Sequence, residues 1–120
     1  MSINVIGGHI YTSSEIFNSG LYLVERLELY RFTINPDGPI FSRGYRITYL
    51  YSGDIKIISA ESADQLIYSL SYISSRDFPS DSADKFLEAA IKTGDFSLVA
   101  VKEALFSGED ANNQESLAVH

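Results

Sequence analysis

Apolar residues recur at every second position through much of the first half of the chain, and this period is typical of β-strands. Two short apolar runs flank Gly7-Gly8, a pattern that predicts a hairpin. Longer runs over residues 21–34, 40–51 and 55–59 are separated by turns rich in glycine, proline and aspartate. We therefore expect an antiparallel meander of about three to five strands.

Parts of this half leave more than one interpretation open. Residues 13–20 are mostly polar and end in Asn-Ser-Gly, which is typical of a turn. We expect a serine to cap a single helical turn there. Residues 21–34 are apolar on both parities, which indicates a strand that is covered on both faces, bulged or paired. A helix competes over residues 21–30, where apolar residues also fit helical spacing. Gly44 interrupts the next strand and suggests a bulge.

In the second half of the chain the apolar period changes to that of helices. Ser62 and Gln65 match a capping box. Their helix carries an apolar stripe of Ala63, Leu66, Ile67, Leu70 and Ile73. Residues 77–80 break this helix and start a second, which Gly94 ends, and a third short helix runs to Phe106. Because the strands come first, we predict an α+β fold in which three short helices pack on one face of the antiparallel sheet.

The length of 120 residues fits one compact domain, which we place at residues 1–106. Residues 107–120 are polar and acidic, so we expect a disordered tail there. No run approaches the ~18 apolar residues of a membrane span, and the start lacks the basic and apolar regions of a secretory signal. We therefore expect a cytoplasmic protein that has no membrane partner.

The charge of the chain is unevenly distributed. The net charge is −7, with five acids and five bases in residues 1–60 but eleven acids and four bases in residues 61–120. An acidic surface repels phosphate backbones, so the charge argues against direct nucleic-acid binding. The same surface favours solubility and can steer a partner that has a basic surface.

Few residues of the chain are suited to covalent or metal chemistry. The absence of cysteine excludes disulfides, thiolate metal ligands and a cysteine nucleophile. His9 is the one histidine of the expected domain, since His120 lies in the tail, and no zinc-ligand spacing is present. Serine-hydrolase motifs and phosphate-binding glycine loops are also absent. We expect no metal, no cofactor and no enzymatic activity, with a small enzyme that uses His9 as an alternative.

The tyrosines are the most distinctive candidates for a functional surface. Of the eight, Tyr49 and Tyr51 share one face of a predicted strand, and Tyr68 and Tyr72 are spaced i, i+4 on a predicted helix. Tyrosine is enriched at interfaces because its ring offers a large area, few rotamers and a polar tip. These four residues are candidate anchors for a partner, and burial in a sheet–helix core is the competing interpretation.

Three acids form a second candidate surface. Asp81, Asp84 and Glu88 lie on one stripe of the second predicted helix, and such a row can steer a basic partner or imitate phosphates. Lys85 and Lys92 follow Asp81 and Glu88 at i+4, however, which is the ordinary spacing of solvated ion pairs on a helix. Two interpretations therefore stay open: the three acids contact a partner, or they form a solvated helix face without a binding role.

These observations favour a small acidic protein that is not an enzyme and that binds and blocks a protein partner. Phage or plasmid inhibitors and immunity proteins are similar in type, by analogy only. The four tyrosines would supply the anchors, and the three acids would steer a partner with a basic surface. The main alternative is a homodimeric domain that binds a small ligand, which a tyrosine hydroxyl and an arginine would orient.

Overall fold

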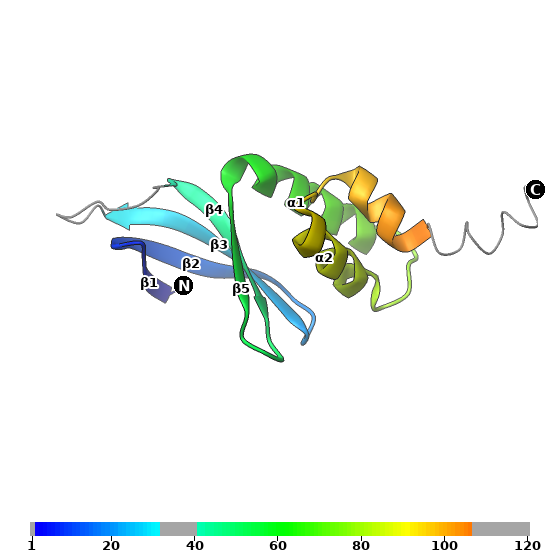
Figure 1. Ribbon diagram of the computed structural model, residues 1–120, viewed down its shortest axis with the longest axis horizontal. Coiled ribbons are helices and arrows are strands. Elements are labelled where there is room, and N and C mark those ends of the chain that lie inside the picture. Colours follow the sequence, from blue (N-terminus) through cyan, green and yellow to red (C-terminus); the bar gives the residue numbers. More distant parts are fainter. Residues whose placement is uncertain (1, 32–40, 107–120) are drawn as a thin grey trace, which may run out of the picture. The chain divides into compact units, whose positions relative to one another are not determined.

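The computed structural model describes residues 2–31 and 41–106, in which five strands precede three helical segments (Figure 1). The elements are β1 (Ser2–Ile6), β2 (His9–Asn18), β3 (Tyr22–Arg31), β4 (Arg43–Tyr49), β5 (Ile55–Ser59), α1 (Ala60–Ser74) and α2 (Ser82–Thr93). The third helical segment covers residues 98–106. The α+β class and the antiparallel meander are confirmed. The turn expected after residue 34 and the tail expected at 107–120 lie outside the described residues.

The chain divides into two compact units, residues 1–63 and residues 64–120. The first, called the sheet unit, contains all five strands, and the second, called the helical unit, contains most of α1 and the later helices. A single domain over residues 1–106, with the helices packed on one sheet face, stays a prediction.

The sheet unit is a meander in which each strand pairs antiparallel with the next, in the order β1-β2-β3-β4-β5. Gly7 and Gly8, with φ of 58° and 83°, form the two-residue turn between the paired residues Ile6 and His9. Positive φ at both positions is the geometry of a type I′ turn, whose twist matches that of paired strands. The hairpin predicted around this glycine pair is confirmed.

The helical turn expected over residues 13–20 is wrong, because β2 continues through them to Asn18. Ser13 pairs with strands on both sides and is only 2% exposed. A register shift between Glu15 and Phe17 interrupts the alternation of apolar and polar residues. The sequence pattern therefore did not mark this strand.

β3 is a strand rather than the competing helix, and both of its faces are covered. Val24 and Leu27 are three positions apart in one unbroken register with β4, so they lie on opposite faces of the strand. Both are 0% exposed. A register shift against β2 leaves Tyr30 as an extra residue between Leu29 and Arg31. Burial on both faces and this bulge explain why the apolar residues follow no single parity.

Gly44 lies in β4 without a register shift, so the bulge expected there is wrong. A Cβ at this position would collide with the backbone carbonyl oxygen of Ile58 and crowd the ring of Phe41. The glycine instead allows β5 and Phe41 to approach β4 closely. The Phe41 ring also stacks on Tyr11 at 4.6 Å between centroids, and the Tyr11 hydroxyl donates a hydrogen bond of 2.7 Å to the Phe41 carbonyl oxygen.

The sheet buries side chains on both of its faces. According to the pairing register, one face buries Tyr22, Val24, Tyr45, Ile47 and Ile58. The opposite face buries His9, Tyr11, Ser13 and Leu27.

The ends of the helices differ in how well the sequence marks them. α1 begins at Ala60, so Ser62 lies inside its first turn and the capping box predicted there is wrong. Gly94 ends α2 with a φ of 80° and donates its N–H to the Ala90 carbonyl oxygen at 2.7 Å, as predicted. Among the described residues of the helical unit, the buried apolar ones are Leu66, Leu70, Ile73, Phe86, Leu87, Ala90, Phe96, Ala100 and Val101.

Two hydrogen bonds fix the start of the third helical segment. The buried Ser69 hydroxyl of α1 donates to the Phe96 carbonyl oxygen at 2.8 Å. The Asp95 carboxylate accepts the backbone N–H of Ser97 at 2.9 Å. Hydrogen bonds from the Ser97 side chain and backbone lower the pKa of Asp95 below its usual value of 3.8, because they favour the charged carboxylate.

Candidate functional site

Two turns lie at the same end of the sheet unit, and the first joins β2 to β3. The side chain of Asn18 accepts the backbone N–H of Gly20 at 2.8 Å. The hydroxyl oxygen of Ser19 accepts the N–H groups of Leu21 at 3.2 Å and Tyr22 at 3.1 Å. These short polar side chains satisfy backbone donors that the turn would otherwise leave unpaired, so they hold the turn in one conformation.

The second turn joins β4 to β5 and is held in the same manner. Gly53 donates its N–H to the Tyr49 carbonyl oxygen at 2.7 Å, and Tyr49 donates its N–H to the Asp54 carbonyl oxygen at 2.9 Å. The Ser52 hydroxyl donates to Asp54 Oδ2 at 2.9 Å, and it accepts the Asp54 N–H at 3.2 Å. Gly53 has a φ of 81°, which a residue with a Cβ adopts only at a cost.

A backbone hydrogen bond joins the two turns. Leu50 donates its N–H to the Leu21 carbonyl oxygen at 2.8 Å. Around this bond, the exposed fractions are 37% for Leu21, 41% for Leu50 and 86% for Tyr51, and Tyr49 is half-buried. We call these four residues the hairpin-tip surface. Leu21 and Leu50 come one position beyond the Tyr22–Tyr49 pair, so all four residues lie at the same end of the sheet unit. Exposed large apolar side chains at one end of an ordered sheet are typical of an interaction site.

Three tyrosine rings connect the hairpin-tip surface to the buried part of the sheet. Tyr22 is 6% exposed, and its ring centroid lies 5.2 Å from that of Tyr49 at an interplanar angle of 43°. Tyr49 in turn lies 6.1 Å from Tyr51 at an angle of 55°. Both distances are within the range of favourable tilted ring contacts. Exposure therefore rises from ring to ring, and the outermost ring is supported from below.

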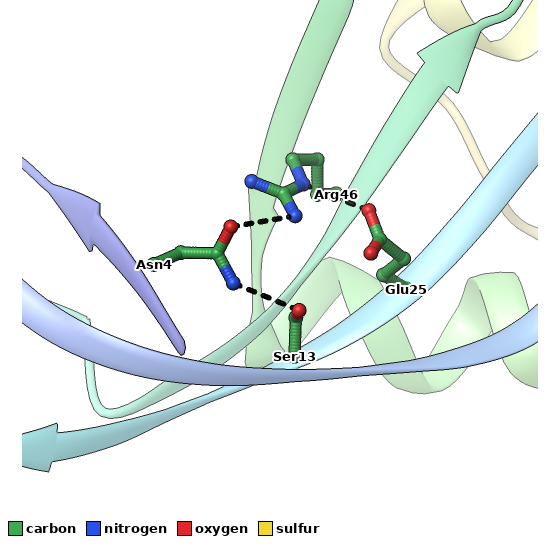
Figure 2. Close-up of polar contacts among 4 residues, drawn as sticks. All are labelled: Asn4, Ser13, Glu25 and Arg46. Carbon is green, nitrogen blue, oxygen red and sulfur yellow. Dashed lines mark hydrogen bonds and ion pairs between the residues drawn. The ribbon is translucent and has the colours of Figure 1, made fainter. Parts of the chain in front are cut away.

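A cluster of polar side chains lies on one face of the sheet unit, with one member from each of the first four strands (Figure 2). Asn4 Nδ2 donates to Ser13 Oγ at 2.8 Å, and Asn4 Oδ1 accepts from Arg46 Nη2 at 3.2 Å. Arg46 Nε also bonds Glu25 Oε1 at 2.9 Å, in an ion pair whose side chains are each 16% exposed. The first and fourth strands of a flat sheet lie about 14 Å apart, so the long Arg46 side chain reaches across two strands to Asn4. Glu25 neutralises Arg46 within the cluster.

The two tyrosines predicted as anchors on α1 have different surroundings. Tyr68 is 61% exposed. Tyr72 is half-buried, with its ring 6.2 Å from that of Phe78 and with the Arg76 guanidinium 4.1 Å from its centroid. Phe78 lies 5.7 Å from Phe106 in the same aromatic cluster. Tyr68 is therefore open to a partner, whereas Tyr72 has intramolecular contacts on its ring.

The acids predicted to steer a partner lie at the start of α2 and along it. Lys85 Nζ lies 3.6 Å from Asp81 Oδ2, and Lys92 Nζ lies 4.0 Å from Glu88 Oε2, so both i,i+4 ion pairs are confirmed. The side chains of both pairs are exposed, so each pair adds little to stability. Asp84 belongs to the same row and is half-buried.

The remaining chemical candidate, His9, is only 1% exposed, and by register it lies on the face that buries Tyr11. Its imidazole is thus out of reach of a substrate in bulk water. Among residues 2–31 and 41–106, no group of three or more histidine or acidic side chains is arranged to hold a metal ion. In the same part of the chain, no helix combines the length and the apolar character that crossing a membrane requires.

Comparison with protein-family models, with curated protein sequences and with solved structures found no match. The site must therefore be judged from its own residues. Sequence reasoning identified Tyr49 and Tyr51, and the structure brings them together at the hairpin-tip surface. It missed Leu21 and Leu50, although a signal was present, because large apolar residues beside a Ser-Gly turn are placed where little can cover them.

Proposed function

We propose that this chain is a small non-enzymatic protein that binds and blocks a protein partner, with the hairpin-tip surface as its anchor. The observation that carries the proposal is Tyr51, which is 86% exposed although the turn around it is fixed by hydrogen bonds. Aromatic rings that are exposed but well ordered are typical of the residues that dominate binding energy at interfaces.

The order of the hairpin-tip surface supports its role as an anchor. Tyr22 is buried and contacts Tyr49, which contacts Tyr51, so the outer ring has a defined support. The hydrogen bond between Leu50 and Leu21 keeps the two turns together. Because an ordered surface loses less conformational entropy on association, more of its contact energy remains as affinity.

The chemistry of the hairpin-tip surface defines the kind of partner that it fits. Leu21, Leu50 and the Tyr51 ring supply apolar area, and the Tyr51 hydroxyl supplies one hydrogen bond at the rim. A protein surface with an apolar pocket and a polar rim complements these groups. The excess of acids over bases in residues 61–120 favours approach by a basic partner, mainly through the association rate.

Two observations support binding rather than chemistry. His9 is buried, so the histidine on which the enzyme alternative depends is not accessible to a substrate in bulk water. The guanidinium of Arg46, in the polar cluster of the sheet, already forms hydrogen bonds with Glu25 and Asn4. Orienting a small ligand would therefore require this arginine to give up one of these bonds.

The experiment compares three alanine variants of exposed tyrosines that lie in different places. Tyr51→Ala removes the proposed anchor, Tyr68→Ala removes the candidate on α1, and Tyr30→Ala is a matched control, since Tyr30 is 60% exposed on β3. A partner is captured on the immobilised chain, identified by mass spectrometry and purified, and its dissociation constant is measured for each variant. We expect Tyr51→Ala to weaken binding by about 30-fold and the control by less than about threefold.

The other outcomes are equally informative. Unchanged affinity for Tyr51→Ala, together with a loss for Tyr68→Ala, would move the site to α1. Unchanged affinity in all three variants would contradict an aromatic anchor altogether.

The contribution of the acids is tested separately by the double charge reversal Asp84→Lys and Glu88→Lys. We expect the association rate to fall about tenfold at low salt with little change in the dissociation rate, because the charges act during approach. An association rate equal to that of the wild type would remove these acids from the mechanism and leave the anchor untouched.

A further inference from the structure

β1 is an outer strand of the sheet, and in the described residues it pairs only with β2 (Figure 1). Its sequence is Ser-Ile-Asn-Val-Ile, without charge or proline. Ile3 and Val5 lie on the same face of the strand and are 67% and 72% exposed. Natural sheets usually protect an outer strand with a lysine, a proline or a covering segment, because its backbone groups are free to pair with another strand.

The geometry of the first hairpin determines which backbone groups of β1 point outward. Ile6 and His9 flank a two-residue type I′ turn, and residues in that position exchange both backbone hydrogen bonds. Every second residue of β1 then makes backbone hydrogen bonds to β2, so the backbone groups of Asn4, like those of Ile6, point toward β2. The N–H and C=O groups of Ile3 and Val5 therefore point away from the sheet.

We propose that β1 pairs with β1 of a second copy of this chain, antiparallel and with the twofold axis at Asn4. In this register Ile3 of one copy lies opposite Val5 of the other, and the outward N–H and C=O groups of both residues are satisfied in reciprocal pairs. The exposed side chains of Ile3 and Val5 meet across the strands on one face. Each β1 supplies the strand partner that the other β1 lacks, so the assembly is complete with two copies.

Two further features favour a second copy of the chain as the partner of β1, namely the opposite outer strand of the sheet and the distribution of charge. β5, the other outer strand, carries the exposed Lys56, and a lysine on an outer strand disfavours pairing. Residues 1–60 contain equal numbers of acids and bases, so two copies meet here without net repulsion, whereas residues 61–120 hold the whole excess of acids. Two copies would also present two hairpin-tip surfaces to one partner.

A single introduced cysteine tests the register directly, because the chain has no cysteine of its own. In Asn4→Cys, the two cysteines face each other as a non-bonded pair with Cα atoms about 4.5 Å apart, which suits a disulfide. In the matched control Ser2→Cys, the two cysteines lie four residues out of register, about 13 Å apart along the strands. Under oxidised glutathione, we expect Asn4→Cys to form covalent dimer at least about tenfold faster than the control. Equal rates would overturn the proposed pairing.

A second pair of variants tests the pairing without cysteine. Val5→Pro removes an outward N–H and leaves the bonds to β2 in place, whereas Val5→Thr keeps the donor and the branched side chain. Because the contact is small, we expect a dissociation constant of about 10–100 μM for the wild type by sedimentation. Val5→Pro should weaken dimerisation at least about tenfold and Val5→Thr by less than about threefold, with circular dichroism confirming that both are folded. A wild type that stays monomeric at about 500 μM, or a folded Val5→Pro that dimerises normally, would refute the proposal.

Discussion

Replacing Gly44 by alanine tests the close approach between β4 and β5. The backbone of Gly44 does not require positive φ, so alanine is acceptable there on conformational grounds alone. The obstacle is the added Cβ, which would collide with the carbonyl oxygen of Ile58 and crowd the Phe41 ring. An aromatic ring can rotate away, but the carbonyl oxygen can move only if β5 separates from β4.

The size of the effect follows from two opposing terms. Overpacking against a rigid neighbour costs about 3 kcal/mol, at the upper end of the usual range. The smaller entropy of the unfolded chain with alanine offsets this by up to about 1 kcal/mol. We therefore expect Gly44→Ala to lower the free energy of unfolding by about 2 kcal/mol, which corresponds to a fall in Tm of roughly 10 °C for a domain of this size.

Urea unfolding followed by circular dichroism measures this effect, with Gly53→Ala as the control. A Cβ at Gly53 meets nothing within 4 Å, but φ is +81°, so alanine there costs about 1–2 kcal/mol through backbone strain alone. Backbone amide NMR shifts separate the two causes, since Gly44→Ala should perturb residues of β5 as far as Ile58 and Gly53→Ala only the turn. A Gly44→Ala variant as stable as the wild type, with unshifted β5 resonances, would refute the close approach.

Three further predictions concern single polar groups. Glu25→Gln should lower the free energy of unfolding by about 1.5–3 kcal/mol in urea titration, because Arg46 loses its charged partner in a half-buried cluster. Ser69→Ala should cost about 1–3 kcal/mol in the same assay, since a buried carbonyl oxygen loses its donor. The pKa of Asp95 is lowered by hydrogen bonds from Ser97, so its contribution to stability is present above pH 3.8 and is lost as pH falls through the lower folded pKa. Asp95→Asn should therefore weaken the acid dependence of unfolding at pH 2–4, and an unchanged dependence would contradict that assignment.

Periodicity in the sequence was sufficient to predict strands followed by helices, and it failed where a register shift or a backbone contact intervened. The Gly7-Gly8 hairpin and the Gly94 helix end depend on local chemistry, and both were predictable. The strand through residues 13–18 was missed because the shift after Glu15 breaks the alternation. The bulge predicted at Gly44 is wrong because the sequence does not show which backbone lies close to a glycine.

The candidate site shows the same limit in another form. Tyr45, Tyr49 and Tyr51 have the same parity, so alternation assigns them to one face without distinguishing them. Their exposure nevertheless rises along the chain from 5% at Tyr45, through a half-buried Tyr49, to 86% at Tyr51. Which residue of an alternating series can reach a partner depends on where the covering segments stop. The Leu50–Leu21 hydrogen bond, which joins segments far apart in sequence, holds the turn of Tyr51 beside the turn between β2 and β3. Under the proposed function, mutating the turn that supports Tyr51 should therefore weaken partner binding almost as much as removing its ring.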